Sequence, residues 1–218
     1  MTATNKTTQD KYEALTKLTA GDFKAFLYDC DGTLADTMPG HKKSYVRVAA
    51  EDGVLIEESI IDEFAGLPIL DVVLEINKRY NSTFDPVDFA ERKEKIFLSE
   101  YIDQTQPIDY VVNHLKAHAG KMRIAVVSGG DREAVKRTLS MLGILELAEV
   151  LVCAGETPRG KPFPDPFLAA AEFLGVAPEH CLVFEDGDPG VQAGVVTFEV
   201  HPIRSFPGDA LPPAAATT

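Results

Sequence analysis

The chain has 218 residues, of which 45% are hydrophobic and 25% charged, the balance of an ordinary globular protein. Its formal net charge is −13. This excess of negative charge argues against nucleic acid or an anionic membrane as a partner. An anionic substrate would need local positive charge, from a metal ion or from a well-placed lysine.

The ends of the chain and its cysteines predict a cytoplasmic protein. The N-terminal extension (residues 1–21) lacks the apolar stretch of a signal peptide, and no apolar run is long enough to span a membrane. Cys30, Cys153 and Cys181 lie in apolar runs without the spacing of a zinc site or a CxxC pair, so we expect buried thiols. Residues 205–218 are rich in Pro, Ala and Thr, and we expect them to be disordered.

Apolar runs and amphipathic segments alternate along most of the chain. The apolar runs occupy residues 24–29, 123–130, 148–155, 180–188 and, more weakly, 195–202. Helical spacing of apolar residues occurs at 108–120, 131–144 and 165–176, each ending at or beside a glycine. Short buried strands that alternate with helices indicate βαβ units. We therefore predict an α/β protein with a Rossmann-like parallel sheet and helices on both faces.

The stretch between the first two strands breaks this alternation. A structureless loop of that length is not expected in a compact domain. The segments 41–53, 57–66, 69–81 and 86–104 have helical patterns, and Pro39 and Pro107 flank them. We therefore predict a helical cap resembling a four-helix bundle. It would occupy residues 38–107 and be inserted into a core formed by residues 1–37 and 108–210.

Polar side chains follow the predicted strands and precede one predicted helix. They are Asp29, Asp31, Ser128, Lys161, Glu185 and Asp186. Ligands of open parallel sheets bind at the carboxyl ends of the strands, so we expect these groups to share one site. Carboxylates so close together repel one another unless a cation lies between them, and oxygen ligands suit Mg²⁺.

Each of these groups also has an ordinary structural interpretation. The pair Asp31–Gly32 could be only a turn, and Ser128 could cap a helix. Lys161 could be a solvated loop lysine, and the Glu–Asp pair at 185–186 could cap the next helix. Their coincidence at the strand ends favours a functional site.

Four motifs resemble those of the haloacid dehalogenase superfamily and occur in the same order. They are DCDGTLADT (29–37), VVSGG (126–130), GKPFPDPF (160–167) and FEDGDPGVQAG (184–194). The insert is similar to the C1 helical cap of the β-phosphoglucomutase-like subgroup. Within that subgroup the chain most resembles bacterial sugar-phosphate phosphatases of the fructose-1-phosphate type. The resemblance implies a phosphoric monoester hydrolase that uses Mg²⁺.

The resemblance also assigns roles to the residues. Asp29 would attack phosphorus to form an aspartyl-phosphate, and Asp31 would protonate the leaving oxygen and then deprotonate the attacking water. Residues i and i+2 of a strand share a face, so both carboxylates can reach one substrate while Cys30 points into the core. Mg²⁺ would bind Asp29, the backbone carbonyl of Asp31 and Asp186, with Glu185 as an outer or alternative contact.

The same resemblance gives the remaining groups a part in binding and proton transfer. Ser128 and Lys161 would hold the phosphoryl oxygens, aided by backbone N–H groups near Gly129 and Gly32. Dehalogenases and phosphonatases lack the second aspartate of the first motif, so its presence favours phosphate-ester hydrolysis or mutase chemistry. His41 stands where a histidine of the subgroup assists catalysis or cap closure. The alternative is a solvated histidine on the insert's first helix.

Two departures from the family pattern bear on function. The insert segment FAGLPILDVV (64–73) lacks the arginine that clamps a second phosphate in β-phosphoglucomutases, which favours a phosphatase over a mutase. Lys42, Lys43 or Lys78 could supply the clamp instead. The segment after Gly190 is several residues shorter than usual, which leaves a non-catalytic phosphometabolite-binding protein as a third possibility. We predict a monomeric phosphatase for a small phosphorylated metabolite, a sugar phosphate, with no nucleic-acid or membrane partner.

Overall fold

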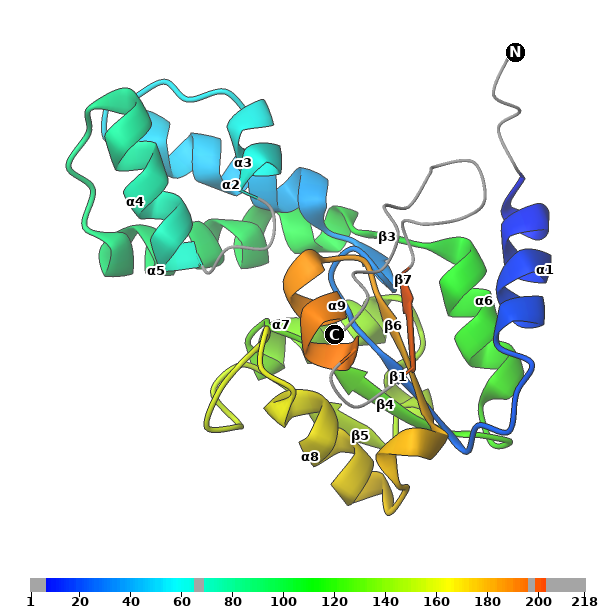
Figure 1. Ribbon diagram of the computed structural model, residues 1–218. Helices are drawn as coiled ribbons and strands as arrows, with labels where there is room; N and C mark the ends of the chain where they lie inside the picture. The colour runs from blue at the N-terminus through cyan, green and yellow to red at the C-terminus, as the bar shows by residue number, and fades with distance from the viewer. Residues whose placement is uncertain (1–6, 65–68, 196–198, 203–218) are drawn as a thin grey trace, which may run out of the picture.

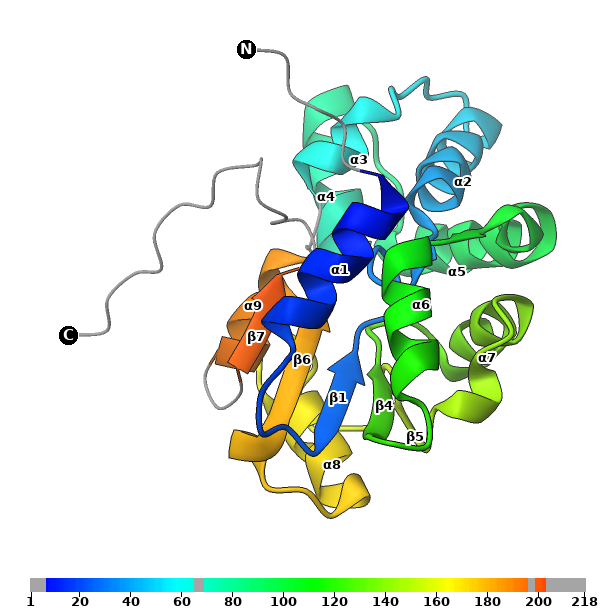
Figure 2. The same cartoon turned by 90° about the vertical axis from the view of Figure 1, so that its right-hand side faces the viewer.

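The computed structural model describes residues 7–64, 69–195 and 199–202 as a parallel sheet covered by helices, with a second group of helices beside it (Figures 1 and 2). The predicted disordered tail (205–218) and residues 65–68 of the predicted cap lie outside the described residues.

Five parallel strands form the central sheet, in the order β5-β4-β1-β6-β7. Their bounds are β1 (Ala25–Tyr28), β4 (Arg123–Val127), β5 (Val150–Val152), β6 (Cys181–Glu185) and β7 (Glu199–Pro202). Leu27 of the central strand is level with Ala125 and Val183 of its neighbours. Every residue of β1 and β6 is buried, which explains why these runs are continuously apolar instead of alternating.

Helices cover both faces of the sheet, as predicted. Leu15, Leu115 and Leu139 pack on one face, and Phe167 and Leu174 pack on the other. The first face carries α1 (Thr8–Leu18), α6 (Asp109–His118) and α7 (Arg132–Met141); the second carries α8 (Asp165–Leu174) and α9 (Asp188–Val195). Helix α9 therefore forms although the segment after Gly190 is shorter than in the family that the sequence resembles.

Helix α1 is an element that the sequence patterns above do not predict. It begins with a capping box, in which Thr7 Oγ1 accepts from the Asp10 N–H and the Asp10 carboxylate accepts from the Thr7 N–H. Thr19 follows its last turn, and its hydroxyl lies 2.8 Å from His114 Nε2. His114 Nδ1 lies 2.8 Å from the Tyr28 hydroxyl, so buried hydrogen bonds tie the helix to the central strand.

The predicted insert folds as a second group of helices with an apolar core of its own. This core includes Tyr45, Val48, Ile60, Val73, Ile76 and Phe89. The helices are α2 (Met38–Glu51), α3 (Ser59–Glu63), α4 (Ile69–Tyr80) and α5 (Pro86–Ile96). In Figure 2 the arrow of β1 points toward these helices, so they lie beyond the carboxyl end of the strands, where ligands bind.

The connections between insert and core differ from the sequence expectation. The chain leaves and re-enters through an antiparallel ribbon of two-residue strands, β2 (Ala35–Asp36) and β3 (Gln106–Pro107), which are too short to show a period. The expected helix at 86–104 ends at Ile96. A π-helical turn, η1 (Phe97–Tyr101), and a 3₁₀ turn, η2 (Ile102–Gln104), follow it. The π turn packs closely on α2, where a Cβ at Gly40 would lie 3.0 Å from atoms of Phe97 and Tyr101.

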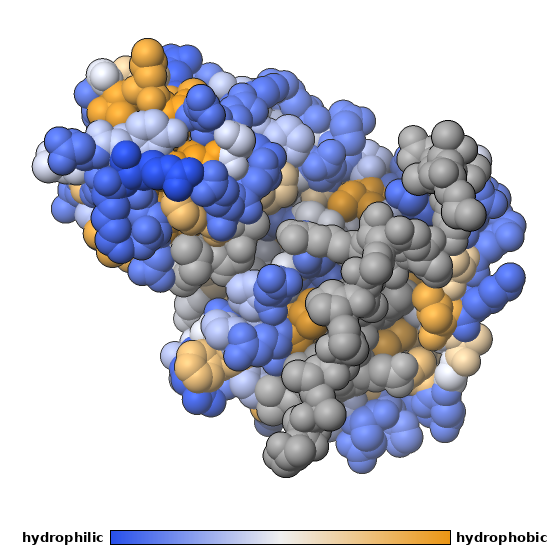
Figure 3. Space-filling model, turned by 45° about the horizontal axis from the view of Figure 1, so that its top comes forward, coloured by the Kyte–Doolittle hydropathy of each residue, from blue (hydrophilic) through white to orange (hydrophobic). Residues whose placement is uncertain are grey.

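The three cysteines are free and buried, as predicted. Among the described residues, no helix combines the length and the apolarity needed to cross a bilayer. The face shown in Figure 3 is mostly hydrophilic, with a hydrophobic patch over the insert.

Candidate active site

Asp29 and Asp31 follow the central strand at its carboxyl end. Cys30 between them is fully buried in the core, so the two aspartates project away from it. The turn after them requires a glycine, because Gly32 has a φ of +87° and a Cβ there would lie 2.3 Å from Asp186 Oδ2. This turn brings the first sequence motif into contact with the fourth.

Lys161 is the positive charge at the centre of the site. Its Nζ donates to Asp29 Oδ1 at 2.7 Å, to Glu185 Oε1 at 2.5 Å and to the Val127 carbonyl at 2.9 Å. Burial disfavours the charge, but Asp29 and Glu185 outweigh it and raise the pKa of Lys161 above its ordinary value. The alternative of a solvated loop lysine is therefore wrong, since only 11% of this side chain is exposed.

Two bidentate ion pairs hold the loop that carries Lys161. Arg132 of α7 donates to both oxygens of Glu156, at 2.5 and 2.8 Å. Arg159 donates to both oxygens of Asp165 at the start of α8, at 3.0 and 2.8 Å. The loop between β5 and α8 is thus fixed to both neighbouring helices.

Ser128 lies at the end of β4, facing the aspartates. Its hydroxyl is 3.3 Å from Asp31 Oδ2 and accepts the Gly130 N–H at 3.0 Å. The N-cap of α7 is Asp131, which excludes the interpretation of Ser128 as that cap. Gly129 is exposed, and nothing lies within 4 Å of the place its Cβ would take. This loop offers a hydroxyl and unhindered backbone beside the carboxylates.

Carboxylates at the ends of β1 and β6 lie close enough together to hold a metal ion. Asp29, Glu185 and Asp186 can place one oxygen each within 4.8 Å of one another. Burial, together with the charge of Glu185, raises the pKa of Asp29 well above its ordinary value. Such crowding of buried oxygens fits a hard divalent cation such as Mg²⁺.

The partners of these carboxylates suggest how they would divide the work. Both oxygens of Glu185 are occupied, one by Lys161 and the other by the Gly187 N–H at 2.8 Å. Asp186 Oδ1 accepts a hydrogen bond from Thr33 at 3.0 Å, which directs the carboxylate toward the first motif. Glu185 therefore balances the charge of Lys161, while Asp186 is held beside the first motif.

His41 reaches the site from helix α2 of the insert. Its Nε2 is 3.8 Å from Asp31 Oδ1, and its ring stacks on Phe97 with 4.0 Å between the ring centroids. The Nζ of Lys93 on α5 lies 2.7 Å from Nδ1. An ammonium only donates, so this contact makes Nδ1 the acceptor and leaves the ring proton on Nε2, toward Asp31. The solvated-histidine alternative is wrong, because 19% of the side chain is exposed and both ring nitrogens face partners.

The charge of Asp31 depends on this contact from the insert. Burial alone would raise the pKa of Asp31, but the neighbouring His41 and the charge of Lys93 lower it below its ordinary value. The resting group is therefore a carboxylate at neutral pH.

Lys93 is a site residue that the sequence reasoning missed. Phe89, Lys93 and Phe97 follow one another at a spacing of four, which places the lysine on the buried face of α5, and 5% of its side chain is exposed. A lysine in the apolar stripe of an amphipathic helix was the available signal.

Gly190 enters the sequence analysis only as the start of the shortened segment. A Cβ there would lie 1.7 Å from Glu185 Oε1.

The structure brings all the predicted site residues to one edge of the sheet. They fall into three contact groups: Asp29 with Lys161 and Glu185; Asp31 with Ser128 and His41; and Asp186 with Gly32. Gly129 directly follows Ser128.

Comparisons with known proteins agree with the motifs and with the fold. The sequence model of the haloacid dehalogenase-like hydrolases matches residues 23–196. The fructose-1-phosphate phosphatase YqaB of Escherichia coli (strain K12) is 30% identical over 174 residues, covering 78% of this chain and 90% of that protein. A phosphorylated carbohydrates phosphatase of Thermotoga maritima is 33% identical over 176 residues, covering 78% and 79%.

The structure of a relative has also been compared with this fold. A HAD family hydrolase from Deinococcus radiodurans, with bound phosphate and sodium, is 29% identical and aligns with a TM-score of 0.64 over 82% of this chain and 80% of that one. Motifs, fold and relatives agree, and the chain belongs to the haloacid dehalogenase-like hydrolase family.

Proposed function

We propose that this hydrolase is a phosphatase that cleaves a small sugar phosphate, with Asp29 as nucleophile and Mg²⁺ as its metal. The observation that carries the proposal is the buried contact of Lys161 with Asp29 at the sheet edge, beside Asp186. A carboxylate so placed can approach phosphorus only if positive charge offsets its repulsion from the phosphate. Relatives named as sugar-phosphate phosphatases support the same reaction class.

The residues of this chain fit the metal that the reaction needs. Asp29, Asp186 and the backbone carbonyl of Asp31 would hold Mg²⁺. When bound, the ion supplies the positive charge that lets an anionic nucleophile meet an anionic phosphate. Lys161 and Ser128 would bind the phosphoryl oxygens from the other side, together with the backbone around Gly129 and Gly32.

Two displacements at phosphorus complete the proposed cycle. A carboxylate oxygen of Asp29 bonds to phosphorus as the bond to the sugar oxygen breaks, and Asp31 gives that oxygen a proton. Water then attacks phosphorus, Asp31 takes its proton, and the bond to Asp29 breaks to release phosphate. Asp31 rests as a carboxylate, but an arriving phosphate adds negative charge beside it and raises its pKa, so that it can carry the proton.

The helical insert at residues 38–107 acts as a cap in this proposal. Its boundaries coincide with the β2–β3 ribbon, and it has its own apolar core. It delivers His41 to Asp31, so closure of the cap would complete the site and exclude water. His41 and Lys93 orient Asp31 and its proton instead of bonding to the phosphate.

Side-chain partners favour a phosphatase over a mutase. Lys42 pairs with Asp62 and Lys78 with Glu75, each at 2.5 Å, while Lys43 lies over the Tyr101 ring. Each lysine that could replace the missing arginine is therefore engaged elsewhere, and a bisphosphate would be poorly held.

We further propose a cytoplasmic monomer with no nucleic-acid or membrane partner. The negative net charge of the protein supports the absence of such partners.

A phosphate-release assay tests this function. Wild-type protein and Asp29→Asn are compared on a panel of sugar phosphates, with Mg²⁺ and with a chelator. We expect release by the wild type that requires Mg²⁺ and vanishes in the variant. Rapid conversion of β-glucose-1-phosphate to glucose-6-phosphate with a bisphosphate primer would support the mutase instead. No release by a folded wild type would favour the binding protein.

A further inference from the structure

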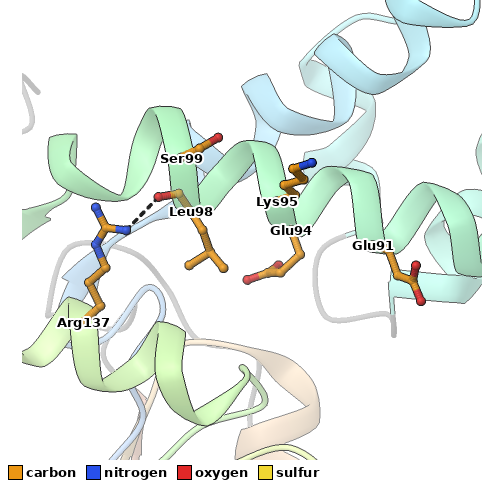
Figure 4. Close-up of a pocket in the computed structure, with 6 residues that line it drawn as sticks. All are labelled: Glu91, Glu94, Lys95, Leu98, Ser99 and Arg137. Atoms are coloured by element: carbon orange, nitrogen blue, oxygen red, sulfur yellow. Dashed lines mark hydrogen bonds between the residues drawn. The ribbon is translucent and has the colours of Figure 1, made fainter.

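Arg137 bridges the sheet domain and the returning segment of the insert. Its side chain leaves α7 and donates from Nη1 to the Leu98 carbonyl at 3.0 Å and from Nη2 to Asp103 Oδ1 at 2.6 Å. Leu98 lies in the π turn η1, and Asp103 in the 3₁₀ turn η2. Figure 4 shows the first of these bonds crossing from α7 to the segment above it.

Two open grooves flank the bridge. An open groove of about 590 Å³ lies on one side, lined by Glu91, Glu94, Lys95, Leu98, Ser99 and Arg137. A second groove of about 480 Å³ shares Leu98 and Arg137 and continues along α7. Leu98 and Arg137 line both grooves, so the two polar contacts of Arg137 connect α7 to the π turn at an open surface.

Both ends of this bridge lead to the catalytic groups. Leu98 follows Phe97, whose ring stacks on His41, and α5 immediately before it carries Lys93, which contacts the same histidine. At the other end, α7 begins directly after the loop of Ser128. The placement of His41 over Asp31 thus depends on the geometry of the turn that Arg137 holds.

We infer that Arg137 is a positioning residue that holds the π turn, and with it Phe97 and His41, over Asp31. This inference rests on the proposed function and adds to it a residue outside the motifs. The guanidinium of Arg137 suits this positioning role, since it can bond a backbone carbonyl and a carboxylate at once. A lysine at this position could keep one of the two contacts.

The test compares Arg137→Ala with two substrates that differ in their need for Asp31. A sugar alcohol is a poor leaving group that requires the proton, whereas acetate leaves acetyl phosphate without one. We expect kcat/KM for the best sugar phosphate to fall about ten- to a hundredfold. For acetyl phosphate, kcat/KM reports only the steps up to the release of acetate, which need no proton from Asp31, and it should stay near the wild-type value. Arg137→Lys should recover part of the loss.

The control is Lys136→Ala, because Lys136 pairs with Glu133 on its own helix and should leave both reactions unchanged. An unchanged kcat/KM for the sugar phosphate in Arg137→Ala, or an equal loss of kcat/KM with both substrates, would overturn the inference. Hydrogen exchange gives a second measurement that does not depend on activity. Residues 97–104 should exchange faster in Arg137→Ala, and unchanged exchange would also contradict the inference. Failure of the proposed function would appear separately, as a wild type that cleaves neither substrate.

Discussion

Single residues at this site are constrained by atoms that the sequence places far away. Glu185 balances Lys161 and is held by the Gly187 N–H, and it fits only because Gly190 has no side chain. A Cβ at Gly190 would lie 1.7 Å from Glu185 Oε1, whereas the nearest atom to a Cβ at Gly187 is 3.6 Å away. The two glycines lie three residues apart, yet only one is required by the catalytic charge network.

We therefore predict that Gly190→Ala displaces Glu185 and loosens Lys161. Phosphate release should fall sharply, and overpacking should cost about 1–3 kcal/mol of unfolding free energy. Gly187→Ala is the matched control and should retain most of its activity and stability. Kinetics and denaturant unfolding of both variants measure the difference. Equal behaviour of the two variants would show that the fit around Glu185 does not matter.

At the scale of elements, the loop from β5 to α8 depends on ion pairs for its shape. Hydrogen bonding to Arg132 lowers the pKa of Glu156 below its ordinary value of 4.5. A carboxyl group with a lowered folded-state pKa stabilises the protein above its unfolded pKa, and the contribution is lost as the pH falls through the folded pKa. The Arg132–Glu156 pair should therefore stabilise the loop at neutral pH and weaken in acid.

The variant Glu156→Gln tests whether this ion pair stabilises the protein at neutral pH and weakens in acid. Its Tm should lie below that of the wild type at neutral pH, by a small amount because the pair is partly exposed. The difference should shrink as the pH is lowered below about 4.5, where the wild type also loses the charge. Glu133→Gln is the control, since that residue is 78% exposed and pairs only with Lys136 among its described contacts. A wild-type advantage that grows in acid would contradict the assignment.

The elements that the sequence predicted share a local cause, whereas the β2–β3 ribbon and the π turn, which it missed, do not. Strands β1, β4 and β6 are continuous apolar runs, and the polar residues after them were expected to meet because parallel strands end together. Ribbon β2–β3 and the π turn arise from contacts between segments that lie 57 to 72 residues apart, and they leave no period in the sequence. Lys93 was predictable from its place on the apolar face of α5, and His41 was predicted from the family resemblance, but the contact between them was not.

The whole molecule concentrates negative charge at the edge between sheet and insert. Its net charge is −13, and four of its carboxylates, Asp29, Asp31, Glu185 and Asp186, lie in the site near Lys161. Such an arrangement is destabilised by self-repulsion until a cation binds. Binding of the metal to the folded state alone should then stabilise the whole protein.

We predict that Mg²⁺ raises the Tm of the wild type. The added free energy of unfolding should be about 2.7 kcal/mol when the Mg²⁺ concentration is one hundred times Kd. Asp186→Asn should lose most of this shift because it removes a carboxylate of the cluster. Asp188→Asn should retain it, since Asp188 is exposed on α9 and lies outside the cluster. Equal shifts in both variants would place the metal elsewhere.

The most direct test of the account is capture of the phosphoryl group on Asp29. Asp31→Asn should still accept phosphate from acetyl phosphate, because acetate needs no proton, but it should be slow to hydrolyse the intermediate. After an acid quench, peptide mass spectrometry should find one added phosphoryl group, on Asp29. A phosphoryl group on another residue would contradict the account. So would phosphate release that survives in Asp29→Asn.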